Sequence, residues 1–103
     1  METKSLTGAE RMEIVERVAK HYGFTPHLDM MIEECGEMIV AINHYKRQRV
    51  STERLIEEFA DIWIVLKQMG VFLDESSIAN VIDYKLRRFN RVINELKIDK
   101  LWK

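Results

Sequence analysis

Four carboxylates in this chain are spaced so that they could bind a divalent cation. Glu34 and Glu37 stand three residues apart, and so do Glu58 and Asp61. Residues three apart on a helix project from one face, with Cβ atoms roughly 5–6 Å apart, so each pair could grip one hard cation. Two such pairs on packed antiparallel helices would surround one cavity with oxygen ligands. Because Mg²⁺ and Mn²⁺ prefer such ligands over those that suit zinc or copper, the sequence predicts a Mg²⁺ site, with Mn²⁺ as the alternative ion.

The second pair lies within residues 57–66, the most apolar run of the chain. On a helix, the apolar residues in and around this run form one wide arc, made of Leu55, Phe59, Ile62, Trp63, Leu66 and Met69. Glu58 projects at the edge of that arc. A helix that is apolar almost all round is expected to be largely buried, and burial of the carboxylates costs several kcal/mol per ion unless a cation compensates.

Direct ion pairs are the alternative to a metal. A later helix carries Lys85 within its apolar arc and Arg88 at its border, and these bases could pair with the acids as buried salt bridges. Four acids would then meet two bases, and the surplus of negative charge favours a divalent cation. A carboxylate di-iron site is disfavoured, because none of His21, His27 and His44 stands three residues after a glutamate.

The spacing of apolar residues is helical throughout, with no sustained alternation. We predict an all-α fold of four helices. The first begins at a capping box at Thr7 and ends at Gly23, the second runs from about Pro26 to Arg47, the third from a cap at Ser51 to Met69, and the fourth from residues 74–77 to about Leu96. At 103 residues the chain is expected to form one domain, residues 1–103. It has little core to spare, so oligomerisation would help, and we expect Leu101 and Trp102 to dock on a neighbouring surface.

Composition excludes several classes of protein. The net charge of −1 gives no electrostatic reason to expect a nucleic acid polymer as partner. The single cysteine, Cys35, rules out an intramolecular disulfide. The polar N-terminus does not read as a signal peptide, and no apolar run approaches the roughly 20 residues that span a bilayer. A cytoplasmic protein without a membrane partner is the expectation.

Three motifs in order resemble those of the MazG-like all-α nucleoside triphosphate pyrophosphohydrolases. They are Glu34-Cys-Gly-Glu37, Glu58-Phe-Ala-Asp61 and Lys85-Leu-Arg-Arg88, within roughly residues 27–93. The resemblance implies a four-helix bundle whose core is completed by dimerisation, in dimers or tetramers with active sites drawn from more than one subunit. It implies Mg²⁺-dependent cleavage of a (d)NTP between the α- and β-phosphates, giving a (d)NMP and pyrophosphate. Some members have asparagine where this chain has Asp83, which leaves Asp83 as either a further ligand or a surface residue.

The chemistry of the residues agrees with that implied activity. A triphosphate would be repelled by four carboxylates. Bound Mg²⁺ would make the interaction of the site with the triphosphate attractive, and it would lower the pKa of a bound water. Glu34 or Glu37 could hold or deprotonate the water as catalytic base. Lys85 and Arg88 could bind the substrate and neutralise charge on the leaving pyrophosphate. A house-cleaning or pool-controlling enzyme follows from this interpretation.

The residues that would bind the base are less clearly marked. Trp63 and His27 are the predicted contacts, His27 because it lies in the first turn of the second helix, seven residues before Glu34. Tyr22, Phe24 and Tyr45 could also stack on a base, although aromatic residues of this kind commonly lie in a core. The competing class of function is a non-catalytic helical interaction module or nucleotide-binding module on the same fold.

Overall fold

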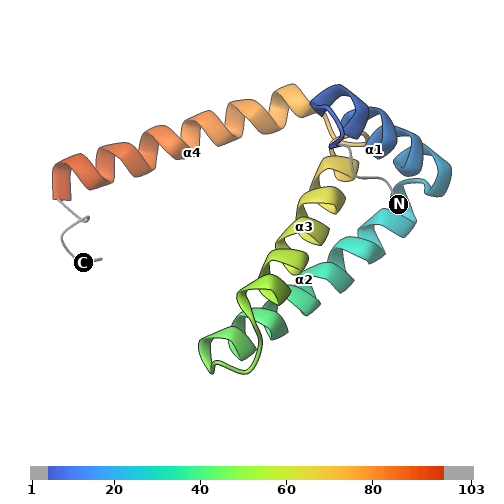
Figure 1. Cartoon of the computed structure of the whole chain (residues 1–103). Helices are drawn as coiled ribbons and strands as arrows, with labels where there is room; N and C mark the ends of the chain where they lie inside the picture. The colour runs from blue at the N-terminus through green and yellow to red at the C-terminus, as the bar shows by residue number, and fades with distance from the viewer. Residues whose placement is uncertain (1–4, 97–103) are drawn as a thin grey trace. The chain divides into compact units, whose positions relative to one another are not determined.

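The computed structural model describes residues 5–96 and confirms that the chain is all-α. Within that range there are four α-helices and no strand: α1 (Gly8–Tyr22), α2 (Phe24–Lys46), α3 (Thr52–Met69) and α4 (Glu75–Leu96) (Figure 1). The chain divides into two units, Met1–Phe72 with α1 to α3 and Leu73–Lys103 with α4. A single domain over residues 1–103, with all four helices in one bundle, stays a prediction.

The predicted helix caps are confirmed at α1 and α3. The Thr7 hydroxyl accepts a hydrogen bond from the Glu10 backbone N–H at 3.1 Å, and the Glu10 carboxylate accepts one from the Thr7 N–H at 2.8 Å. Ser51 accepts a hydrogen bond from the Arg54 N–H at 3.2 Å at the start of α3. These side chains satisfy backbone donors that have no partner inside the helix, and they fix where each helix begins.

The predicted start of α2 is wrong by two residues. Gly23 has φ 90° and ψ 174°, a region essentially confined to glycine, and it both ends α1 and directly precedes Phe24. The turn is therefore made by one residue, and Thr25 lies inside the helix. Pro26 is tolerated there, because N–H groups of a first helical turn lack an intrahelical acceptor in any case.

Helices α2 and α3 form an antiparallel hairpin, joined by residues 47–51 (Figure 1). Buried and half-buried side chains recur along both helices at alternating intervals of three and four residues, the spacing of a coiled-coil seam. On α2 they are His27, Met31, Glu34, Met38 and Ala41, and on α3 they are Leu55, Glu58, Ile62, Val65 and Met69. We call these ten positions the seam. Two of them hold carboxylates.

The apolar arc predicted to be buried on α3 is only partly covered: Leu55, Ile62 and Met69 lie in the seam, and the other three residues are exposed. Phe59 is 55%, Trp63 42% and Leu66 54% exposed. The prediction of burial was wrong for these three residues, because hairpin packing turns the flank with Glu58 and Val65 toward α2. The aromatic flank is therefore left exposed. The same packing that exposes the apolar flank brings the acids inside.

Helix α1 packs on both α2 and α3 and completes the first unit. Its buried residues are Val15 and Ala19. An apolar groove lies where α1 approaches the C-terminal half of α3, and Trp63 and Ile64 line it together with Ile14. The core of the unit is small, since the buried apolar side chains among its described residues are Val15, Ala19, Ala41, Val65 and Met69.

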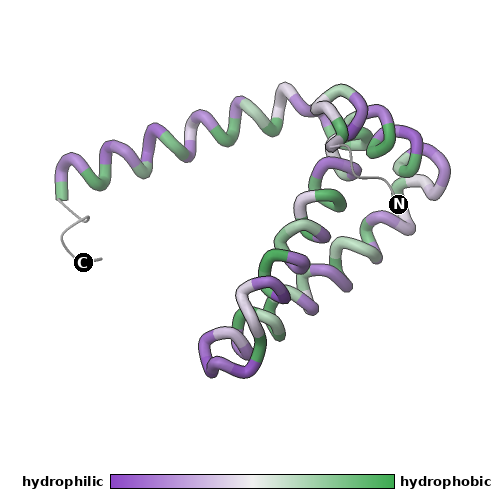
Figure 2. Tube along the Cα trace, viewed as in Figure 1, coloured by the Kyte–Doolittle hydropathy of each residue, from purple (hydrophilic) through white to green (hydrophobic). Residues whose placement is uncertain are grey.

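Helix α4 is a regular amphipathic helix. It begins, as predicted, beside Asp74, whose carboxylate accepts a hydrogen bond from the Ser76 N–H at 3.3 Å. Apolar and polar residues fall on different sides of it (Figure 2), yet none of its residues is buried. No described helix is both long and apolar enough to cross a membrane. The predicted docking residues Leu101 and Trp102 lie outside the described residues.

Candidate metal centre

The structure brings the four predicted acids together between α2 and α3. Glu34 and Glu37 come from α2, and Glu58 and Asp61 come from α3. One carboxylate oxygen of each lies within 4.8 Å of the corresponding oxygens of the other three. Because the two helices run antiparallel and each pair spans less than one helical turn, both pairs face the same point of the hairpin. We call these four residues the acid cluster.

The acid cluster runs from the seam to the surface. Glu58 is only 2% exposed, Glu34 is half-buried, and Glu37 and Asp61 are exposed. The two seam carboxylates therefore form the floor and the two exposed ones the mouth. Such an arrangement gives an ion a way in from water while the inner ligands are held by helix packing.

The negative charge of the cluster is poorly compensated. Burial raises the pKa of Glu34, and the carboxylates of Glu37, Asp61, Glu58 and Glu33 raise it further, in that order. A raised carboxyl pKa means that the ionised form is disfavoured at this position. A cation bound among the four side chains would remove that penalty.

Arg54 is a partner of the cluster that sequence reasoning missed. Its Nη2 lies 2.8 Å from Glu58 Oε1, and its Nη1 lies 3.5 Å from Glu57 Oε2. The signal was present, since Arg54 precedes Glu58 by four residues on one helix, a spacing at which opposite charges meet. Among the described residues of the first unit, Arg54 is the base that forms an ion pair with the cluster. One guanidinium against four carboxylates leaves a negative surplus.

Two carboxylate oxygens in the cluster lack a partner. Glu58 Oε2 and Glu34 Oε2 are buried, and neither accepts a hydrogen bond from any residue within the described range. Buried polar atoms are nearly always paired, and a buried charge left unpaired is more costly still. A hard divalent cation would supply both the missing charge and the missing contact, so the oxygen donor set fits Mg²⁺ or Mn²⁺.

The predicted phosphate-binding bases lie elsewhere in the chain. Lys85 and Arg88 are exposed on α4, as is Asp83. They belong to the second unit. Their participation in the site, as substrate ligands or as salt-bridge partners of the acids, stays a prediction.

The two predicted base-binding residues lie in different environments. His27 is 0% exposed, and its Nδ1 lies 2.9 Å from the Gly23 carbonyl oxygen. A carbonyl only accepts, so Nδ1 donates, and the ring also lies against Tyr22 and Phe72. His27 is thus a core side chain with no accessible face for a nucleobase. Trp63 is accessible, and its ring lies 5.4 Å from the Lys67 ammonium.

Comparison of the chain with models of protein families, with curated proteins and with solved structures finds no match.

Removing one exposed carboxylate should separate metal binding from simple packing. Mg²⁺ at about 100 times its Kd should raise the melting temperature of the wild type by roughly 10 °C through mass action. Asp61→Asn should lose most of that increment. In chelator the same variant should melt at or above the wild-type temperature, because it removes one of four mutually repelling carboxylates.

Glu53→Gln is the matched control for charge, since Glu53 is exposed on α3 and lies outside the acid cluster. It should leave the Mg²⁺ increment intact. Thermal melts followed by circular dichroism, with MgCl₂ or with a chelator, measure both effects. An Mg²⁺ increment that survives in Asp61→Asn contradicts the four-carboxylate site.

The raised pKa of Glu34 gives the metal-free protein a pH dependence of known sign. A carboxyl with a raised folded pKa contributes stability in full below its ordinary value of 4.5, and that contribution is lost as the pH rises through the folded pKa. In chelator, the wild type should therefore lose melting temperature relative to Glu34→Gln as the pH rises above 4.5. A difference between the two proteins that stays flat with pH would show that the carboxyl is not perturbed.

Proposed function

We propose that the chain is a Mg²⁺-dependent (d)NTP pyrophosphohydrolase, which cleaves between the α- and β-phosphates to give a (d)NMP and pyrophosphate. The observation that carries the proposal is the acid cluster, in which two buried oxygens have no hydrogen-bond partner among the described residues. The resemblance of the three sequence motifs to the MazG-like family supports it. So does the place of the cluster on two packed helices, which suits a positioned site.

The acids would act on the substrate in two ways. Mg²⁺, when bound, would offset the negative charge of the cluster toward a triphosphate and lower the pKa of a bound water. Glu58 and Glu34, fixed in the seam, would hold the ion from below. Glu37 and Asp61 lie at the mouth, where an attacking water would be in reach. Glu34 or Glu37 would accept the proton of that water as it bonds to phosphorus and the bridging P–O bond breaks.

Charge on the departing pyrophosphate requires donors that the acid cluster does not contain. Lys85 and Arg88 would fill this role, because ammonium and guanidinium groups form charge-assisted hydrogen bonds to phosphate oxygens. Both are exposed, as residues that meet a soluble substrate must be.

We also propose that the working form is a homodimer or homotetramer. Large apolar side chains are exposed on both helices of the α2–α3 hairpin, among them Ile39, Phe59 and Leu66. Surfaces of this kind mark interaction sites. A second copy of the chain would cover them and enlarge the small core of the first unit.

A screen for released pyrophosphate tests the activity directly. The eight common NTPs and dNTPs, with dUTP added, should include at least one that the wild type converts to the monophosphate in Mg²⁺ and not in chelator. Calorimetry with a non-hydrolysable triphosphate accompanies the screen. Binding without turnover would instead identify a nucleotide-binding module, and absence of both would identify a helical interaction module.

Lys85→Met tests the role of the second unit. The variant keeps the apolar stem and loses the charge, so kcat/KM should fall about 10²-fold if the ammonium contacts phosphate. The melting temperature without ligand should change little, because Lys85 is exposed. Arg87→Met removes a neighbouring exposed charge of the same helix and should be nearly silent in both measurements.

Steady-state kinetics and thermal melts on the two variants distinguish the roles. Wild-type kcat/KM in Lys85→Met would exclude the lysine from phosphate binding. A loss of melting temperature with unchanged activity would assign it instead to packing or to an ion pair.

A further inference from the structure

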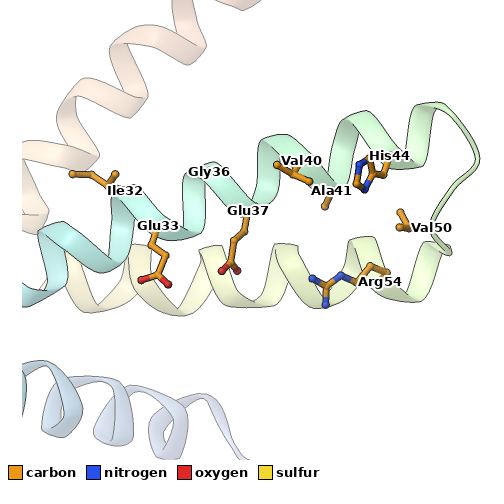
Figure 3. A pocket seen from close by; sticks show the side chains of 9 residues that line it. All are labelled: Ile32, Glu33, Gly36, Glu37, Val40, Ala41, His44, Val50 and Arg54. Carbon is orange, nitrogen blue, oxygen red and sulfur yellow. The ribbon is translucent and has the colours of Figure 1, made fainter.

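A groove of about 490 Å³ lies beside the acid cluster and is lined by residues of α2, of α3 and of the connection between them. Figure 3 shows its lining: Gly36, Glu37, Val40 and His44 from α2, Val50 from the connection, and Arg54 from α3. Its volume falls within the range of about 300–1,000 Å³ typical of small-molecule sites. Neither the proposed metal ion nor the phosphates of the proposed substrate would fill it.

The groove and the acid cluster share structure. Glu37 belongs to both, and Arg54, which lines the groove, holds Glu58 of the cluster through the 2.8 Å ion pair. Figure 3 shows Glu37 pointing from α2 toward α3, with Arg54 on the facing helix. A molecule that fills the groove would therefore be in contact with whatever the acid cluster binds.

Gly36 keeps part of this groove open. It lies well inside the 23-residue helix α2, where glycine destabilises a helix relative to alanine or leucine. A Cβ added at Gly36 would meet nothing within 4 Å, so packing within the described chain gives no reason for a glycine. Glycine inside an element is used where another molecule must approach the backbone closely. The missing side chain points to an occupant from outside the chain.

The chemistry of the lining selects the kind of occupant. The walls are mainly apolar, with Val40, Ala41 and Val50 among them. The carboxylates of Glu33 and Glu37 also line the groove and would repel an anion that no cation screens. An uncharged, flat and partly polar group suits the groove, and His44 and Arg54 can donate hydrogen bonds to it.

We infer that this groove binds the nucleoside, base and sugar, of the nucleoside triphosphate whose phosphates lie at the acid cluster. The inference rests on the proposed function. It assigns the neutral part of the substrate to the groove and the anionic part to the metal. It also replaces His27, which is fully buried, by residues that a nucleoside can reach.

Gly36→Leu tests the inference by filling the groove. The KM for the preferred nucleoside triphosphate should rise about tenfold or more, since a few misplaced carbons in an apolar site change binding on this scale. The melting temperature without ligand should stay the same or rise, because leucine is a better helix former than glycine. Inhibition by inorganic tripolyphosphate, which has no nucleoside, should stay at the wild-type level.

Gly8→Leu is the matched control, because Gly8 also has nothing within 4 Å of an added Cβ and lies outside the groove. It should leave KM unchanged. Gly36→Ala is a smaller intrusion and should shift KM in the same direction by less. This second variant keeps the test decisive should leucine disturb the fold.

The possible results distinguish failure of the groove assignment from failure of the proposed function. If the wild type is active and KM is unchanged in both Gly36 variants, the assignment of the groove to the nucleoside is wrong. The proposed function is not affected by that result. A wild type that releases no pyrophosphate from any triphosphate overturns the proposed function, and the groove assignment falls with it. Light scattering that shows a smaller oligomer for Gly36→Leu than for wild type would make the groove an interface between copies and overturn the assignment.

Discussion

The burial of Glu34 and Glu58 in the seam between α2 and α3 is the constraint on which the rest of the structure depends. Taking a carboxylate out of water costs several kcal/mol, and a leucine at either position would pack without that cost. Arg54 meets one oxygen of Glu58 at 2.8 Å, while the other oxygen and one of Glu34 are left unpaired within the described residues. Packing alone gives no reason for such a seam, whereas the proposed cation would.

Cation binding at the acid cluster, as proposed, would couple function to stability. The four acids come from two helices, so they are brought together only when α2 and α3 are paired. The free energy of binding an ion there is therefore free energy of folding. This matters in a chain with so few buried apolar side chains, in which the seam loses two of its ten positions to acids. Covering the exposed flank of α3 by a second copy would add stability from the opposite side of the same helix.

Local patterns predicted the parts of the structure that local physics determines. Caps at Thr7 and Ser51 and the convergence of the two acid pairs were predictable, because capping and the three-residue spacing act within one turn of helix. The inward flank of α3 was not. An apolar arc shows that a surface will be covered but not by what, and the arc with Phe59, Trp63 and Leu66 is left outside by the α2–α3 pairing. His27 was misassigned for the same reason, since its burial depends on contacts with Tyr22 and Phe72 from other parts of the chain.

Two violations of local rules lie next to each other in α2, and their proximity is itself an argument. Glu34 places a charge in a seam, and Gly36 places a poor helix former well inside a long helix. Sequences that specify one fold tend to agree at every level, and the exceptions concentrate where function requires them. Within residues 5–96 neither residue is explained by its neighbours, because Glu34 Oε2 has no hydrogen-bond partner there and an added Cβ at Gly36 would meet no atom within 4 Å. One ligand would account for both residues. Its anionic part would require the cation held by Glu34, and its neutral part would require the space beside Gly36.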